Sequence, residues 1–174
     1  MTKKFAPLLL LPLFALLMAA CDDSEHSTSA YSVYYHCDLS YSPYNQVTSY
    51  GSFVTLRRKD ASSYYITDIT GKTTTVNLTE TEARQGFFYG LGGLIIGTPS
   101  LCDGNVWAFD WACPTCDRAK YRLTVSRDGT GKAVCPNCGN EYDLNSGGIL
   151  TKGSGRKLWV YGIMRSGSQL FVQN

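Results

Sequence analysis

Two segments, Cys113-Pro114-Thr115-Cys116 and Cys135-Pro136-Asn137-Cys138, decide how this chain is built. Eighteen residues separate them, and a proline follows the first cysteine of each pair. A C-x2-C turn presents two thiolates on one tight loop. Two such loops facing each other complete a four-sulfur tetrahedron that suits zinc or iron. The pattern predicts one metal centre on Cys113, Cys116, Cys135 and Cys138; two disulfides or four unrelated thiols are the alternatives.

The beginning of the chain is organised like a secretory leader. Two lysines precede an apolar run from Phe5 to Met18, which is too short and too broken by proline for a transmembrane span. The run leads into Ala19-Ala20-Cys21, which resembles the lipobox of bacterial lipoproteins, although Met18 stands where that family usually has leucine. The resemblance implies that residues 1–20 are a signal peptide and that Cys21 carries lipid, such as palmitate. An ordinary signal peptide with an incidental cysteine is the alternative.

A lipid on Cys21 would tether a soluble domain to a membrane of the bacterial cell envelope, facing the periplasm or the surface. Residues 21–30 are polar and lack apolar periodicity, which predicts a flexible tether. Removal of the first 20 of 174 residues leaves 154, enough for one domain over residues 31–174. The remaining chain has 14 basic and 14 acidic residues, because both lysines of the leader are removed. This balance gives no electrostatic reason to expect a nucleic-acid partner.

Two cysteines are left over after the metal ligands and the lipidated residue are assigned, Cys37 and Cys102. Export would place them outside the reducing cytosol, so a disulfide between them is expected. Two free buried thiols are the alternative, because the sequence does not show whether the two Cβ atoms approach each other.

The segments before the cysteine pairs predict a mostly β domain with one short helix. Residues 31–35, 52–56, 64–67 and 73–76 are rich in Tyr, Thr and Val and are expected to form strands, with residues 57–60 as a solvated turn. Thr79 and Glu82 form a capping-box pattern, so a helix is expected to begin there and to end near Gly86. The glycine-rich run 89–97 lacks a nucleotide-binding signature and predicts a close-packed bend leading into a strand.

The chain from Asn105 onward resembles a Rieske domain. A strand over 106–110 runs into the first cysteine loop, Tyr142-Asp143 and Gly147 follow the second loop, and segments 158–163 and 169–172 form a closing hairpin. The resemblance implies an antiparallel β domain over residues 31–174, with a two-loop metal-binding subdomain at about 106–148. The segment around Cys135 also resembles the knuckles of zinc ribbons and rubredoxins.

The ligand set departs from the Rieske pattern, in which each loop gives one Cys and one His to a [2Fe-2S] cluster. Cys116 and Cys138 occupy the His positions here, and the first pair is one residue more widely spaced. The histidines of the chain, His26 and His36, lie far upstream and are not expected to be ligands. Zinc on four thiolates is the first expectation, a [2Fe-2S] cluster on four Cys the second and mononuclear iron the third.

These features predict a membrane-anchored lipoprotein with a structural or interaction role. The alternative is a membrane-tethered electron carrier with a [2Fe-2S] cluster, working with a redox or envelope protein and serving an oxidoreductase. No catalytic residue is assigned, because four thiolates fill the coordination of the metal and leave no position for substrate. Thiol exchange at the C-x2-C pairs is the remaining enzymatic possibility, but neither pair lies in a strand-to-helix context.

Overall fold

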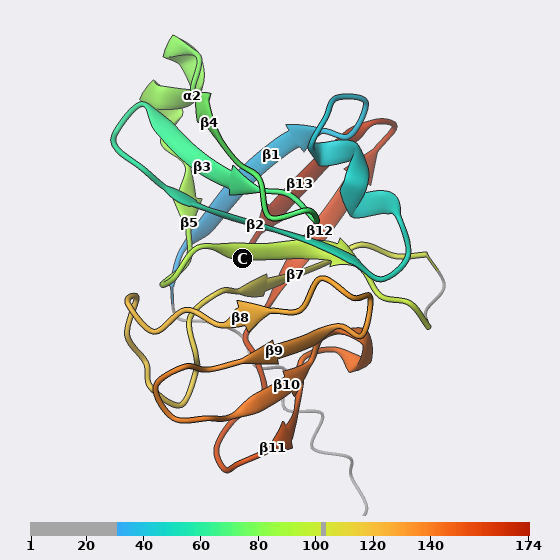
Figure 1. Ribbon diagram of the computed structural model, residues 1–174. Coiled ribbons are helices and arrows are strands. Elements are labelled where there is room, and N and C mark those ends of the chain that lie inside the picture. Colours follow the sequence, from blue (N-terminus) through green and yellow to red (C-terminus); the bar gives the residue numbers. More distant parts are fainter. Residues whose placement is uncertain (1–30, 102–103) are drawn as a thin grey trace, which may run out of the picture.

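The structure, a computed structural model, describes residues 31–101 and 104–174. The fold is mostly β, with 43% of residues in strands and antiparallel sheets, as the sequence predicts. The larger sheet contains β1 (Val33–Asp38), β2 (Ser52–Arg58), β3 (Ser63–Thr67), β4 (Thr73–Asn77), β5 (Phe88–Tyr89), β6 (Leu94–Thr98), β7 (Trp107–Asp110), β12 (Val160–Ser166) and β13 (Gln169–Gln173). The smaller sheet contains β8 (Thr124–Val125), β9 (Lys132–Val134), β10 (Glu141–Asp143) and β11 (Ile149–Lys152). Figure 1 shows the smaller sheet beneath the larger one.

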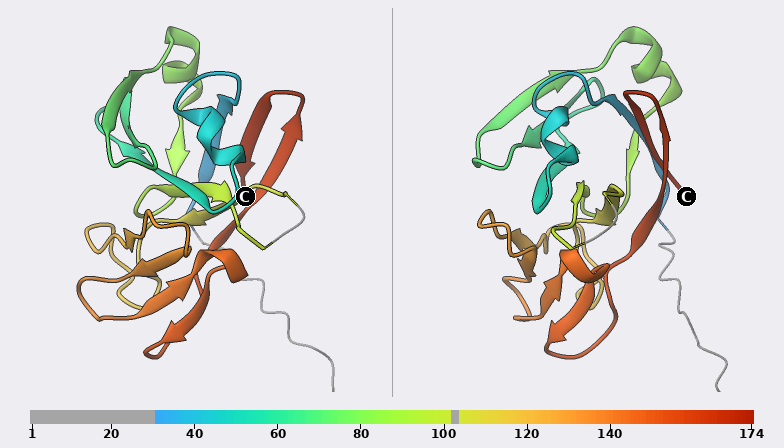
Figure 2. Two further views of the ribbon diagram at one scale, coloured as in Figure 1. Left: turned by 45° about the vertical axis from the view of Figure 1, so that its right-hand side comes forward. Right: turned by 90° about the vertical axis from the view of Figure 1, so that its right-hand side faces the viewer.

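The larger sheet curls around a hydrophobic core. Its strand order is β4-β3-β2-β6-β7-β12-β13-β1-β5, so five strands separate β3 from β1 along the sheet. Tyr64 of β3 nevertheless packs 5.8 Å, between ring centroids, from both Tyr35 of β1 and Tyr89 of β5. The two ends of the sheet therefore face each other across the core, and the curvature is visible in Figure 2.

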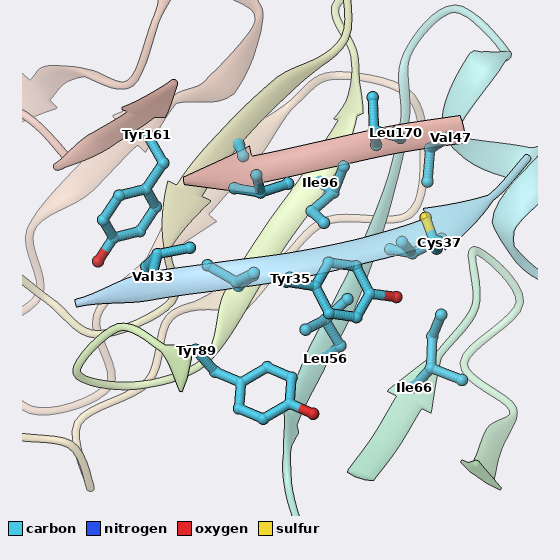
Figure 3. Packing of buried hydrophobic residues seen from close by; sticks show 14 of the residues in the cluster. Val33, Tyr35, Cys37, Val47, Leu56, Ile66, Tyr89, Ile96, Tyr161 and Leu170 are labelled. Atoms are coloured by element: carbon cyan, nitrogen blue, oxygen red, sulfur yellow. The ribbon is translucent and has the colours of Figure 1, made fainter. Parts of the chain in front are cut away.

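The core inside the curled sheet is built by alternation along the strands. In β1, Val33, Tyr35 and Cys37 point inward, while the residues between them are more exposed. Leu56 and Ile96 meet these side chains from β2 and β6, as Figure 3 shows. The period of two that the Tyr-, Thr- and Val-rich segments carry thus produces one buried face.

Strands β2, β6 and β7 are buried on both faces. Leu94 and Ile96 of β6 belong to the core of the curled sheet, whereas Ile95 points the other way. A second apolar cluster lies on that outer face and joins the larger sheet to the smaller one: Phe53, Ile95, Phe109, Leu123, Ala133, Tyr142, Leu144 and Leu158. Every residue of β6 is buried, and its first three residues, Leu94 to Ile96, form a continuous apolar run rather than an alternating pattern.

The smaller sheet is formed by the part of the chain between β7 and β12, two strands of the larger sheet that pair with each other. β7 leads into it and β12 leads out, and these strands pair directly through Val160 opposite Phe109 and Tyr161 opposite Ala108. Its strand order is β11-β10-β9-β8, and the loop after β8 turns at Asp128 and Gly129, as predicted. The excursion therefore begins and ends at one place on the larger sheet.

The local signals before the cysteine pairs are confirmed with two adjustments. Helix α2 (Glu80–Gln85) begins at the Thr79 cap, which exchanges both capping-box hydrogen bonds with Glu82, and it ends at Gly86. The described residues also form the short 3-10 turns η2 (Tyr44–Thr48) and η3 (Leu144–Ser146). The prediction of a solvated turn over residues 57–60 is wrong for its first two residues. Arg57 and Arg58 continue β2 and pair with Tyr65 and Tyr64 of β3. β1 likewise extends beyond residue 35, because β13 continues to pair with it.

Several expectations fall on residues outside the described part. These are the signal peptide over residues 1–20, Cys21, the tether over 21–30, His26 and Cys102. No helix within residues 31–101 and 104–174 is long and apolar enough to cross a membrane. Cys37 is buried in the core of the curled sheet, and its pairing with Cys102 stays a prediction. His36 packs edge-on against Phe87 at 4.8 Å between ring centroids, in β1.

Candidate metal centre

The four paired cysteines converge on one point at the tips of two loops. The Sγ atoms of Cys113 and Cys138 are 3.6 Å apart, and those of Cys116 and Cys135 are 3.7 Å apart. All four Sγ atoms lie within 4.8 Å of one another. The structure thus brings together the complete ligand set that the sequence predicts, and this set could hold one metal ion.

The spacing of the sulfur atoms fits a single four-coordinate ion. A regular tetrahedron with metal–sulfur bonds of about 2.3 Å has sulfur–sulfur edges of about 3.8 Å. The two short sulfur–sulfur distances are close to that edge, and the longest needs only a small movement of side chains. Zinc and mononuclear iron both accept such a set of soft thiolates.

The two loops share one backbone design. The N–H of Asp117 donates to the Cys113 carbonyl at 3.0 Å, and the N–H of Gly139 donates to the Cys135 carbonyl at 2.9 Å. Asp117 and Gly139 each follow the second cysteine of a pair, and both have positive φ, 48° and 74°. Asp117 is the one non-glycine residue with positive φ in the part of the chain that the structure describes. The sequence similarity of the two C-P-x-C segments therefore extends to their three-dimensional shape.

Backbone hydrogen bonds hold each loop to the structure beneath it. The N–H of Cys113 donates to the Tyr121 carbonyl and that of Cys135 to the Asn140 carbonyl, both at 2.9 Å. Cys113 and Cys135, the first cysteine of each loop, are buried in the apolar cluster between the two sheets. Cys116 is half-buried and Cys138 is exposed. One side of the centre therefore faces the protein and the other faces solvent.

Asn140 ties the second loop to the first and to a neighbouring turn. Its Nδ2 atom donates to the Ser154 carbonyl at 2.8 Å and to the Thr115 hydroxyl at 3.0 Å, and lies 3.3 Å from the Tyr142 hydroxyl. The Tyr142 hydroxyl is in turn 3.5 Å from the Cys113 sulfur. Because Asn140 is buried, these contacts satisfy its amide and fix the orientation of the ring next to the sulfur.

Burial and the hydrogen bonds around the sulfurs shift the pKa values of Cys113, Cys116 and Cys138 in different directions. Burial raises the pKa of the Cys113 thiol. Hydrogen bonds from the Tyr142 hydroxyl, the Cys116 backbone N–H and the neighbouring cysteines outweigh this effect and lower the pKa to about 7. Burial and the other cysteines raise the pKa of Cys138 to about 12, and burial raises that of Cys116. The Asn137 amide lies 3.3 Å from the Cys116 sulfur and favours its thiolate. Since a metal ion binds thiolates, binding must displace the protons that remain.

Asp110 anchors the first loop from below. Its Oδ1 accepts hydrogen bonds from the Ala112 N–H at 2.7 Å and the Gly92 N–H at 3.0 Å. Its Oδ2 accepts from the Leu91 N–H and the Tyr161 hydroxyl, both at 2.6 Å. The carboxyl group is completely buried, and burial raises its pKa against the effect of these four donors. One side chain thus joins the glycine-rich bend, β12 and the residue that precedes Cys113.

The sequence identifies the sulfur ligands but not their supports. Asn140 and Asp110 carry no local pattern that distinguishes them from other polar residues, because their partners come from distant segments. Tyr142 stands between two charged residues, Glu141 and Asp143, and this alternation is the sequence signal that marks it as inward-facing. Asp143, a residue near the loops, caps η3 by accepting from the Asn145 N–H at 2.8 Å.

A scan against protein-family models and a search of the curated proteins found no match to this chain. Its functional interpretation therefore rests on its own residues and on the geometry of the centre.

Proposed function

We propose that this chain is a lipid-anchored lipoprotein of the bacterial cell envelope whose β domain is stabilised by one structural zinc ion on four cysteines. It would act as a structural or interaction module held at a membrane. When bound, zinc supplies a four-coordinate cross-link between the two loops. The ligands would be Cys113, Cys116, Cys135 and Cys138.

The observation that carries the proposal is the convergence of the four sulfur atoms within 4.8 Å. Four protein thiolates complete the coordination of zinc, which is the arrangement of structural rather than catalytic zinc sites. A [2Fe-2S] cluster has two irons and bridging sulfides between its two pairs of cysteine ligands. It would therefore need the pairs to stand farther apart than the edges of a single-ion tetrahedron, so the spacing favours one ion.

The size of the metal-bearing sheet supports a structural role. Its strands are two to four residues long, shorter than usual for a sheet that is stable by itself. Buried sulfur atoms from both loops lie within the apolar cluster that joins this sheet to the larger one. A metal ion at this position would fix both loops and the packing of that cluster together.

The lipoprotein part of the proposal comes from the sequence, and so does our further proposal that the β domain is Rieske-like. The lipobox-like segment before Cys21 supports lipid attachment. The arrangement of a two-loop metal-bearing excursion between β7 and β12 agrees with the architecture that the Rieske resemblance implies. A Rieske-like scaffold with Cys at both His positions would keep the loops and change the metal.

Metal identity is the experiment that tests this function. Elemental analysis and visible absorption of protein purified without added metal should give zinc and a colourless solution. Iron with strong visible absorption would instead support the electron-carrier alternative, and two irons per chain would support its [2Fe-2S] form.

Membrane attachment is tested separately with Cys21→Ser. The unchanged chain should fractionate with membranes and carry labelled palmitate, and the variant should be released into the soluble fraction without label. Cys37→Ser serves as the matched control and should behave like the unchanged chain. Membrane retention of Cys21→Ser would contradict the lipid anchor.

A further inference from the structure

A pocket separate from the metal centre lies where β2 ends beside the glycine-rich bend. Its volume is about 250 Å³, and its lining includes Arg57, Arg58, Arg122, Phe88 and the bend over residues 90–93. Arg57 and Arg58 come from β2, and Arg122 comes from the segment after the first cysteine loop. Three arginines from two distant segments therefore line one depression.

These arginines have no acidic partner within salt-bridge distance among the described residues. The salt bridges in the described part of the chain involve other basic residues, namely Arg84, Lys132 and Lys152. Arg122 donates from Nε to the Gly92 carbonyl at 2.5 Å, and Arg58 donates to the Phe87 carbonyl at 3.0 Å. Each guanidinium has five N–H donors, so most of its hydrogen-bonding capacity is still open.

The arginines also lie close enough to influence one another. Arg57 packs over the Tyr65 ring at 4.5 Å, and Arg122 lies 5.8 Å from the Trp111 ring centroid. Burial and the positive charge of Arg57 lower the pKa of Arg122, while Asp110 has the opposite effect. The charges of Arg57 and Arg122 therefore repel each other, and the nearby carboxylate of Asp110 has the opposite effect on Arg122.

The backbone N–H groups of residues 90–92 in the glycine-rich bend do not provide free donors to this pocket. The N–H groups of Leu91 and Gly92 already donate to Asp110, and that of Gly90 donates to the Ser32 carbonyl. The glycines serve close packing, because a Cβ at Gly92 would lie 2.4 Å from the Ala112 nitrogen. Recognition in the pocket would therefore depend on guanidinium side chains rather than on a backbone cradle.

We propose that the pocket lined by Arg57, Arg58 and Arg122 binds a phosphate group. Three guanidinium charges, partly offset by Asp110, match a dianion better than a single carboxylate. The guanidinium fork pairs with phosphate oxygens in a bidentate manner. The exposed ring of Phe88 at the pocket edge offers apolar contact to whatever carries the phosphate. The proposal is independent of the metal centre.

The first test is a titration of the full chain with inorganic phosphate, followed by NMR of the arginine Nε–H groups and the amides of residues 90–93. Potassium chloride at equal ionic strength is the reference. Saturable shifts confined to these groups are expected, and Arg57→Gln and Arg122→Gln should each weaken binding about tenfold. Arg165→Gln is the matched control and should bind like the unchanged chain.

Folding and metal content of each variant are measured alongside, so that an unfolded variant is not mistaken for loss of the site. If Arg122→Gln fails to fold, Arg57→Gln and Arg58→Gln carry the test. Shifts that are absent, or equal in all variants, or reproduced by chloride would overturn the proposal.

A second arm distinguishes a lipid phosphate from a free one. Co-sedimentation with phosphatidylcholine vesicles is compared with and without phosphatidic acid, for the unchanged chain and for Arg57→Gln. A gain in binding with phosphatidic acid that Arg57→Gln removes would assign the site to a lipid headgroup. Phosphate binding without such a gain would assign it to a soluble phosphate compound.

Discussion

The residue after each cysteine pair has a positive φ, but the first loop has aspartate there and the second has glycine. Gly139 meets it without cost, whereas Asp117 adopts positive φ with a side chain, a conformation that costs an L-residue roughly 1–2 kcal/mol. A Cβ at position 139 would have nothing within 4 Å, so Gly139→Ala changes only the backbone energy.

Gly139→Ala is therefore expected to lower the free energy of unfolding by about 1 kcal/mol, and Asp117→Gly to leave it unchanged or raise it. The exposed hydrogen bond from Tyr31 to Asp117 is lost in the second variant and offsets part of the gain. Denaturant unfolding of both variants at saturating zinc measures the difference. A larger loss for Asp117→Gly than for Gly139→Ala would contradict the shared design of the loops.

Asp110 is the residue whose replacement should most disturb the approach to the first loop. Each carboxylate oxygen of Asp110 accepts two hydrogen bonds. Asp110→Asn would replace one of these oxygens with an NH2 group, which donates, so the two buried donors that face it would lose their acceptor. The expected cost is about 1–3 kcal/mol in the free energy of unfolding. Chemical denaturation compares it with Asp60→Asn, an exposed turn carboxylate that should cost less.

At the scale of the element, the β8–β9 connection depends on an exposed carboxylate. Hydrogen bonds from Ser126 and Thr130 lower the pKa of Asp128 to about 2. Because the folded pKa lies below the ordinary value of 3.8, this carboxylate stabilises the fold above about pH 4. The stabilisation is lost as the pH falls through about 2.

An NMR titration of the side-chain carboxyl should place the pKa of Asp128 well below that of an unstructured aspartate. Ser126→Ala combined with Thr130→Ala should return it toward 3.8. An Asp128 pKa that is the same in both proteins would show that the turn hydrogen bonds do not form.

Elements with local signals are the part of this fold that the sequence predicts well. The α2 capping box, the Asp128-Gly129 turn and the paired C-P-x-C segments all contain their partners within a few residues. The start of the 57–60 turn was predicted wrongly, because β3 supplies the partners that keep Arg57 and Arg58 in a strand. The supports of the centre, Asn140 and Asp110, likewise depend on segments that the chain brings together only on folding.

At the scale of the whole molecule, two separate apolar clusters stabilise the fold. Among the described residues, the core of the curled sheet includes Cys37 but none of the four C-x2-C cysteines, whereas the cluster between the two sheets includes Cys113 and Cys135. Metal removal should therefore act first on the smaller sheet.

Hydrogen exchange after treatment with a chelator measures this directly. Amides of β8–β11 should lose protection, and those of β1, β2 and β13 should keep most of theirs. Equal loss of protection in both sheets would mean that the domain unfolds as one unit when the metal leaves.

Metal stoichiometry, together with cysteine alkylation under non-reducing conditions, shows whether the four thiolates hold one metal centre. One metal ion per chain is expected, with Cys113, Cys116, Cys135 and Cys138 unoxidised and protected until a chelator is added. Cys113→Ser should lose the metal, and Cys37→Ser should retain it because that thiol lies in the other core. Metal-free protein with both C-x2-C pairs as disulfides would contradict the claim.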